Sequence, residues 1–386
     1  EEMDKTSKKS EDFGDKSKNA VVGLDDILAT VGIVAVLNKI ADAFSDASDK
    51  ATAFETNVAM VSTVADTTVL SADQLSTQIS GLSKDTAKNV NELADATYNA
   101  ISAGVATEGA VETVGEASKL AKAGFTSSAS ALSVLTTALN AYQLEASEVT
   151  NISDSLITSQ NLGVMTIDQL SSSMGKAIST ASAYSIDLYN LESGYISLTK
   201  AGVSVEESTT YISSMFNELG DSGSEVAGVI MEETGQSFGQ LMKSGYSLAD
   251  VLEILYNSVD QDSEALMNLW GSAEAGKAAN AVINQGLDTF NTNLDKLRNS
   301  AGTTEKAYSA MTNTTQYATE RMQNSFDNLA IEIGEDINPT VASFKNGIAD
   351  ITDKFTELVS KHPAISALLT GCLLYTSPSP RDRTRS

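Results

Sequence analysis

Histidine and cysteine are almost absent from this chain of 386 residues, which contains one of each. A disulfide within the chain needs two cysteines, and a Cys/His zinc cluster needs several ligands of these two types. His362 is therefore the one side chain whose ordinary pKa suits general base catalysis near neutral pH. We expect no catalytic, cofactor-binding or metal-binding residues.

Basic and aromatic residues are also scarce. The chain has 25 Lys and Arg against 51 Asp and Glu, a formal net charge of -26, and only 6% aromatic residues. A surface this acidic repels phosphate backbones, so we expect no direct nucleic-acid recognition. Small apolar side chains allow close helix packing but build thin cores, which favours elongated bundles over an enzyme with a deep pocket.

Long apolar runs are missing from the N-terminal region. The first 18 residues are charged and lack the apolar core of a secretory signal. The run from Ile27 to Ile40 spans 14 residues and contains Asn38 and Lys39, so it is too short to cross a bilayer. It is typical of a buried or partner-facing helix, with membrane-surface association as the alternative.

What the chain does have is helical periodicity. Apolar residues recur at steps of three and four, as at Leu75, Ile79 and Leu82, and no window alternates with a period of two. A long helix is expected from about Thr304 to Ile333. The pattern predicts an all-α fold, an elongated array of helical hairpins and long amphipathic helices.

A recurring turn punctuates these helices: a glycine, a hydrophobic residue and then a hydroxyl residue. We predict that the glycine adopts a positive φ at a helix end and that the hydrophobic residue packs back on the last turn. The glycines of this turn are Gly124, Gly163, Gly202 and Gly245, and Gly104 is a further helix-end glycine.

Hydroxyl residues in these turns should cap the helices that follow. Three of them, and Ser71 before another helix, have an acid or amide three residues later, the spacing of a capping box. The predicted pairs are Ser71 with Gln74, Thr166 with Gln169, Ser204 with Glu207, and Ser247 with Asp250. The four turn glycines lie 39, 39 and 43 residues apart. This spacing fits either stacked helical hairpins or helix ends that merely happen to contain glycine.

Motifs that imitate catalytic sites lack their partners. The segment Gly271–Lys277 has the glycine and lysine spacing of a phosphate-binding loop, but Ala278 replaces the hydroxyl residue that would hold magnesium. The segment Gly220–Gly223 reads Gly-Asp-Ser-Gly without an upstream histidine. Adjacent acids such as Glu206 and Glu207 are typical of solvated helix faces.

Composition and helical pattern divide the chain into five segments. We predict a charged lead-in and long helix at 1–50, a core of helical hairpins at 51–219, a second helical segment at 220–300, and long helices at 301–371. Residues 372–386 concentrate prolines and arginines and resemble translated sequencing adaptor, with a genuine basic tail as the alternative. Residues 364–371 begin an apolar run, and we expect the native gene to continue it into a membrane-spanning length.

A family resemblance rests on several helical blocks in order. FETNVAMVSTVADT, NELADATYNAISAGV and LAKAGFTSSASALSVLTTALNAY together resemble the core of phage tail tape measure proteins, and the resemblance continues from MTIDQLSSSMGKAIS onward. It implies a structural protein of the virion tail that templates tube length, is present in the host cytoplasm during assembly, and leaves the tail during genome delivery.

The same resemblance implies the partners. These are the tail tube protein, tail assembly chaperones and distal tail or baseplate proteins, with a homo-oligomer in the tail lumen and host membrane contact through the missing C-terminal part. The alternative function from composition is a secreted helical protein, either a membrane-acting toxin or a bundle-forming adhesin. Neither function requires an enzyme.

Overall fold

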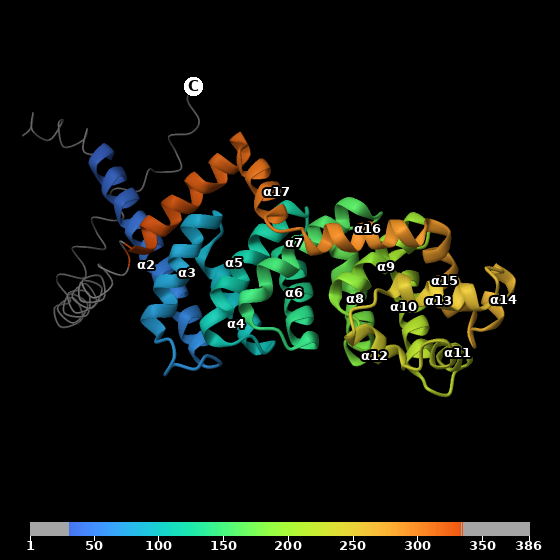
Figure 1. Ribbon diagram of the computed structural model, residues 1–386. Coiled ribbons are helices and arrows are strands. Elements are labelled where there is room, and N and C mark those ends of the chain that lie inside the picture. The colour runs from blue at the N-terminus through green and yellow to red at the C-terminus, as the bar shows by residue number, and fades with distance from the viewer. Residues whose placement is uncertain (1–30, 333, 335–386) are drawn as a thin grey trace, which may run out of the picture. The chain divides into compact units, whose positions relative to one another are not determined.

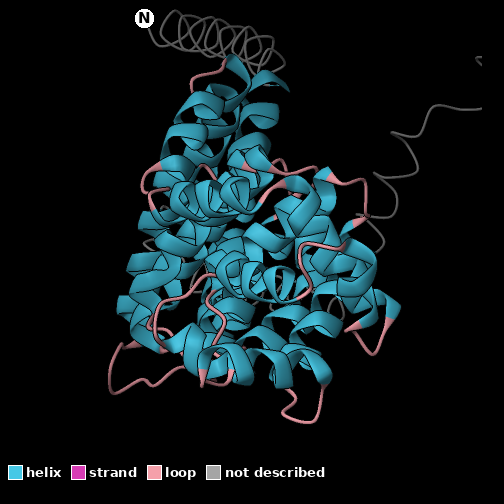
Figure 2. Cartoon of the chain, turned by 45° about the vertical axis from the view of Figure 1, so that its right-hand side comes forward, coloured by secondary structure: helices cyan, strands magenta, loops and turns pink. Residues whose placement is uncertain are grey.

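The structure, a computed structural model, describes residues 31–332 and residue 334. His362, the apolar run at 364–371 and the segment 372–386 lie outside the described residues. No strand occurs in the described part of the chain, so the all-α prediction is confirmed (Figure 2). Residues Ala53–Asn328 form one compact unit, which contains all the features discussed below.

The helices are α2 (Val31–Ser62), α3 (Ala72–Thr86), α4 (Val90–Ser102), α5 (Thr107–Ala123), α6 (Ser128–Tyr142), η1 (Ala146–Glu148), α7 (Val149–Leu162), α8 (Ile167–Ala183), α9 (Leu188–Lys200), α10 (Val205–Gly220), α11 (Glu225–Thr234), α12 (Phe238–Lys243), α13 (Leu248–Ser258), α14 (Ser263–Asn268), α15 (Ala273–Gln285), α16 (Leu287–Arg298) and α17 (Thr303–Thr312). A further helix covers residues 315–332.

Hydroxyl residues cap α3, α8, α10 and α13 as predicted, whereas the cap of α6 is Ser127 and not Thr126, the hydroxyl residue of the turn. Ser71, Thr166 and Ser247 each form a complete capping box with the residue three positions on. The Ser204 hydroxyl accepts a hydrogen bond from the backbone N–H of Glu207, but the box is not reciprocal, because the Glu207 carboxylate accepts from the same hydroxyl at 3.2 Å. Such caps satisfy N–H groups that have no partner within the helix.

Three consecutive helix pairs stack side by side: α5 with α6, α7 with α8, and α9 with α10 (Figure 1). The even-numbered helices form one layer, in which α6 packs on α8 and α8 packs on α10. The odd-numbered helices form a second layer, in which α5 contacts α7 and α7 contacts α9. We call α3–α10 the array. Between Gly124 and Gly202, one 39-residue interval contains α6, η1 and α7, and the next contains α8 and α9, so each holds two α-helices that belong to different stacked pairs.

The next interval breaks this regularity. Between Gly202 and Gly245 lie three helices, α10, α11 and the short α12, so the 43-residue interval does not hold two α-helices like the others. Beyond it, α13 and α15 pack on α16, and α15 also covers α10. The boundaries proposed at residues 219 and 300 remain predictions.

After α15 the chain turns back over the odd-numbered layer. Helix α16 packs on α9 and α7, and α17 packs on α7 and α5 (Figure 1, orange). The predicted single helix from Thr304 to Ile333 is wrong, because the chain bends at residues 313–314. There Asn313 leaves helical geometry, and the Thr314 hydroxyl caps the next helix by accepting from the Tyr317 N–H at 3.2 Å. We call α16, α17 and residues 315–328 the return helices.

Candidate functional site

The contact between the return helices and the array is unusually polar for a packed helix interface. Three ion pairs join residues that are far apart in the sequence, and each links a return helix to the array. They are Arg298–Asp187 at 3.1 Å, Lys119–Glu305 at 2.9 Å and Lys122–Glu320 at 2.8 Å. We call this contact the polar seam.

Asp154 on α7 holds the start of α17. Its two carboxylate oxygens accept hydrogen bonds from the backbone N–H groups of Gly302 and Thr304, both at 2.7 Å. The side chain is 2% exposed, and the neighbouring Ser153 hydroxyl lies 3.0 Å from the Thr304 hydroxyl. A carboxylate at a helix N-terminus satisfies unpaired N–H groups and interacts favourably with the helix dipole. Asp154 therefore caps a helix about 150 residues later in the chain.

Glu116 on α5 lies beside this cap. It is 6% exposed, and burial raises the pKa of its carboxyl group above the ordinary value, while a hydrogen bond with Ser153 opposes the shift. Lys119, one turn further along α5, has a raised pKa because its ammonium donates to Glu305. The same hydrogen bond lowers the pKa of Glu305. This part of the polar seam thus contains a carboxylate in an ion pair, Glu305, and a buried carboxyl group, Glu116.

Glu192 on α9 is the most deeply buried acid of this region. It is 1% exposed, and its Oε1 accepts a hydrogen bond from the Ser155 hydroxyl at 3.0 Å. Its Oε2 has no hydrogen-bond partner. Burial raises its pKa to about 8, the Ser155 hydrogen bond lowers it less, and the nearby Asp187 carboxylate raises it further. With so little exposure, this carboxyl group is inaccessible to a substrate, although its raised pKa alone would suit an acid catalyst.

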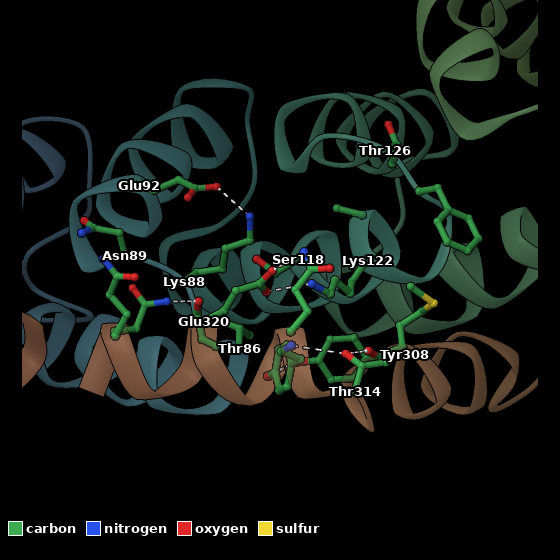
Figure 3. Close-up of a pocket in the computed structure, with 18 of the residues that line it drawn as sticks. Thr86, Lys88, Asn89, Glu92, Ser118, Lys122, Thr126, Tyr308, Thr314 and Glu320 are labelled. Atoms are coloured by element: carbon green, nitrogen blue, oxygen red, sulfur yellow. Dashed lines mark hydrogen bonds and ion pairs between the residues drawn. The ribbon is translucent and has the colours of Figure 1, made fainter. Parts of the chain in front are cut away.

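A cavity of about 650 Å³ lies beneath the far end of the return helices (Figure 3). Lys122 crosses it to reach Glu320, and its ammonium also lies 5.3 Å from the ring centre of Tyr317. Tyr308 and Tyr317 meet edge to face, with their hydroxyl oxygens 2.9 Å apart. Lys122 and Glu320 are therefore paired in this cavity, and the two phenolic groups contact each other.

Neither a metal site nor a membrane-spanning helix occurs among the described residues. No group of three or more His, Cys, Asp or Glu side chains is arranged there to hold a metal ion. No helix in that part of the chain is long and apolar enough to cross a bilayer.

The turn glycines divide into two kinds. Gly104, Gly202 and Gly245 follow helix ends and have φ values of 100°, 89° and 93°. The prediction of positive φ is wrong at Gly124 and Gly163, where φ is -94° and -99°.

Close packing, not φ, explains these two exceptions. A Cβ at Gly124 would lie 2.7 Å from a side-chain carbon of Ile167, and Phe125 adopts the left-handed conformation in its place, with φ 56°. At Gly163 the chain leaves the helix in an extended conformation, and a Cβ would lie 2.8 Å from the Met165 methyl group and 3.2 Å from the Thr199 hydroxyl. A Cβ at either position would therefore force a neighbouring side chain to shift.

At three turns the hydrophobic residue after the glycine does not pack back as predicted. Phe125 is 73% exposed, Val164 70% and Tyr246 42%. The buried apolar residue is instead the first residue of the following helix, such as Ile167 or Leu248, which the helix geometry directs into the core. Val203, after Gly202, is half-buried, and Val105, after Gly104, is buried.

The motifs that imitate catalytic sites serve the fold. The Glu218 carboxylate accepts from the Gly271 N–H at 2.7 Å and from the Ser272 hydroxyl at 2.5 Å, so an internal carboxylate occupies the place where a phosphate would bind. Lys277 lies over the Tyr211 ring at 5.4 Å. In the Gly-Asp-Ser-Gly segment, Asp221 accepts from the Gly223 N–H and closes a turn.

Sequence reasoning missed Asp154, Glu116 and Glu192. For Glu116 and Glu192 the available signal was their position: α5 and α9 bury most of their circumference, and both carry glycine and serine residues that allow close helix contact. Position alone does not identify a buried acid, because Glu108 and Glu112 of α5 are exposed. The partners of the buried acids lie too far away in sequence to be inferred.

Comparison with known proteins gives a consistent result. Residues 76–271, half of the chain, match the family described as Phage-related minor tail protein. A probable tape measure protein of Clostridium phage phiCD119 is 28% identical over 336 residues, which cover 84% of this chain and 36% of the relative. The chain thus spans about a third of the length of that relative. No solved structure matches it.

Proposed function

The chain belongs to the family of phage-related minor tail proteins, and from this premise we propose that it is part of a tape measure protein. In this role it sets the length of the tail tube during assembly and leaves the tail when the genome is delivered. The observation that carries the proposal is the similarity to a probable tape measure protein along 84% of the chain. The toxin or adhesin alternative is not favoured.

The array supports this role physically. A ruler must extend along a tube, and each interval between Gly124 and Gly202 is a serial unit of 39 residues that could contribute a fixed length when opened. If the residues of one such interval formed a continuous helix, they would span roughly 60 Å at about 1.5 Å per residue. The small side chains that dominate the helices suit close packing within a lumen.

The partners follow from the same proposal. They are the tail tube protein, tail assembly chaperones and distal tail or baseplate proteins, with several copies of the chain together in the tail lumen. Assembly would take place in the host cytoplasm before the protein enters the virion tail. The protein would act without catalysis, since Lys122 and Glu320 of the described cavity are paired and its two phenolic groups contact each other.

Tail length tests the proposal directly. In the phage or prophage that carries the gene, deletion of residues 125–163 should shorten the tail by roughly 60 Å, measured by electron microscopy of purified particles. The matched control replaces residues 125–163 with a second copy of residues 164–202, which keeps the number of residues and should keep the tail length. Unchanged tails after the deletion would overturn the role of a ruler.

A further inference from the structure

The return helices are held to the array in two different ways. Helix α16 buries Phe290, Leu294 and Leu297, which are at most 3% exposed, so it is bound by a conventional apolar face. Beyond it, the chain passes Gly302, whose φ is 80°, and enters α17. We call residues 300–328 the strap.

The strap contacts the array through hydrogen bonds and ion pairs. At its beginning, Asp154 binds the Gly302 and Thr304 N–H groups. At its end, the Asn328 amide donates to the Ser83 hydroxyl at 2.9 Å, and Asn324 donates to the Ala87 carbonyl. The partly exposed ion pairs exchange each partner for water when they separate, so each contributes little net stability. The buried hydrogen bonds to the Asp154 carboxylate contribute more.

Apolar residues of the strap lie on both of its sides. On the array side the rings of Tyr308 and Tyr317 are 9% and 8% exposed, whereas Met322 is 57% exposed and Phe326 is 64% exposed. Part of the apolar surface of the strap is therefore left out of its contact with the array, although the apolar face of a helix usually packs on the core. The cavity of about 650 Å³ beneath the strap further reduces the apolar contact (Figure 3).

We propose that the strap is a releasable element: residues 300–328 separate from α3, α5 and α7 as a unit while α6, α8 and α10 remain folded. Gly302 supplies the hinge, because its left-handed conformation lies between the apolar α16 and the polar α17. Release exposes groups that hydrate readily, and it leaves the apolar even-numbered layer intact. The chain therefore opens in a fixed order, strap first and hairpins later. The proposal depends on the fold alone and not on the tail role.

Hydrogen exchange measured by mass spectrometry on the full chain tests this order. Amides of α17 and residues 315–328 should exchange at least about 100-fold faster than those of α6 and α8, because local opening requires less free energy than global unfolding. Equal protection of the strap and α8, lost together as denaturant is added, would overturn the proposal.

A reversible disulfide provides the second arm. Ser153→Cys with Thr304→Cys, in a Cys372→Ser background, joins two buried positions whose hydroxyl oxygens lie 3.0 Å apart. In the oxidised protein, strap exchange should slow at least about tenfold while α6 and α8 are unchanged. Reduction of the same sample is the matched control and should restore fast exchange. If oxidised and reduced samples exchange alike in the strap, its release is not the opening step. Should the disulfide fail to form, exchange of the unmodified chain still decides.

Discussion

The two sides of the odd-numbered layer are held by opposite physical means. The even-numbered helices cover one side with apolar residues such as Leu135, Met174 and Ile178, all fully buried. The strap covers part of the other side, where it binds Asp154 of α7 and Lys119 and Lys122 of α5. Apolar burial stabilises the fold in proportion to the area removed from water. A hydrogen bond or ion pair within the protein replaces an interaction that the same groups would make with water, so its net contribution is smaller. One side should therefore unfold only with the whole unit, and the other should open locally.

The strongest test of the apolar side is Leu135→Ala. Leu135 is fully buried on α6, so its truncation should lower the free energy of unfolding by about 2 to 5 kcal/mol through lost burial and an unfilled cavity. Chemical denaturation monitored by circular dichroism measures the change. Val164→Ala, at a side chain 70% exposed, is the control and should have little effect. Similar losses in the two variants would remove the proposed contrast.

Glu192 tests whether a buried acid within the odd-numbered layer lowers stability. Its folded-state pKa is raised from 4.5 to about 8, so the folded protein retains a proton that the unfolded chain loses. Stability is therefore highest below the unfolded pKa and falls as the pH rises to about 8, by on the order of 3 kcal/mol. Glu192→Gln should abolish this decline in denaturation experiments from pH 5 to 8. A variant that declines as steeply as the unmodified protein would assign the effect to other groups.

Asp154→Asn tests whether the cap acts locally. Asparagine keeps the shape but offers one acceptor oxygen to two N–H groups, so we expect a loss of about 1.5 to 3 kcal/mol. The loss should appear as faster amide exchange in Thr303–Thr312, with exchange in α8 nearly unchanged. Asp168→Asn, on an exposed side chain of α8, controls for the loss of one negative charge. Faster exchange throughout the unit would show that the strap and the array unfold together.

The smallest effect is expected at Lys122. Its ion pair with Glu320 is partly exposed, with 26% and 38% of the two side chains accessible, so the pair should contribute about 0.2 to 1 kcal/mol. A double-mutant cycle with Lys122→Met and Glu320→Gln would isolate this energy, and added salt should reduce it. A coupling energy above the range for exposed pairs would make the polar contacts of the strap stronger than proposed.

Local signals in the sequence predicted the helix starts well. Ser71, Thr166 and Ser247 cap their helices because both partners of each box lie within four residues, so backbone geometry alone brings them together. The all-α class followed from periodicity, which is also a local property. Hairpin stacking from α5 to α10 was only one of two readings of the glycine spacing, since spacing does not specify which helices touch.

The helical class and most helix caps can thus be predicted from the residues alone, because both depend on neighbours in the sequence. The close contacts at Gly124 and Gly163 depend on the folded chain, because the atoms near them belong to other helices or to the following turn. The fold alone joins Asp154 to Gly302 and Ser83 to Asn328. Such contacts link residues about 150 and 250 positions apart, and their geometry depends on how every intervening helix packs.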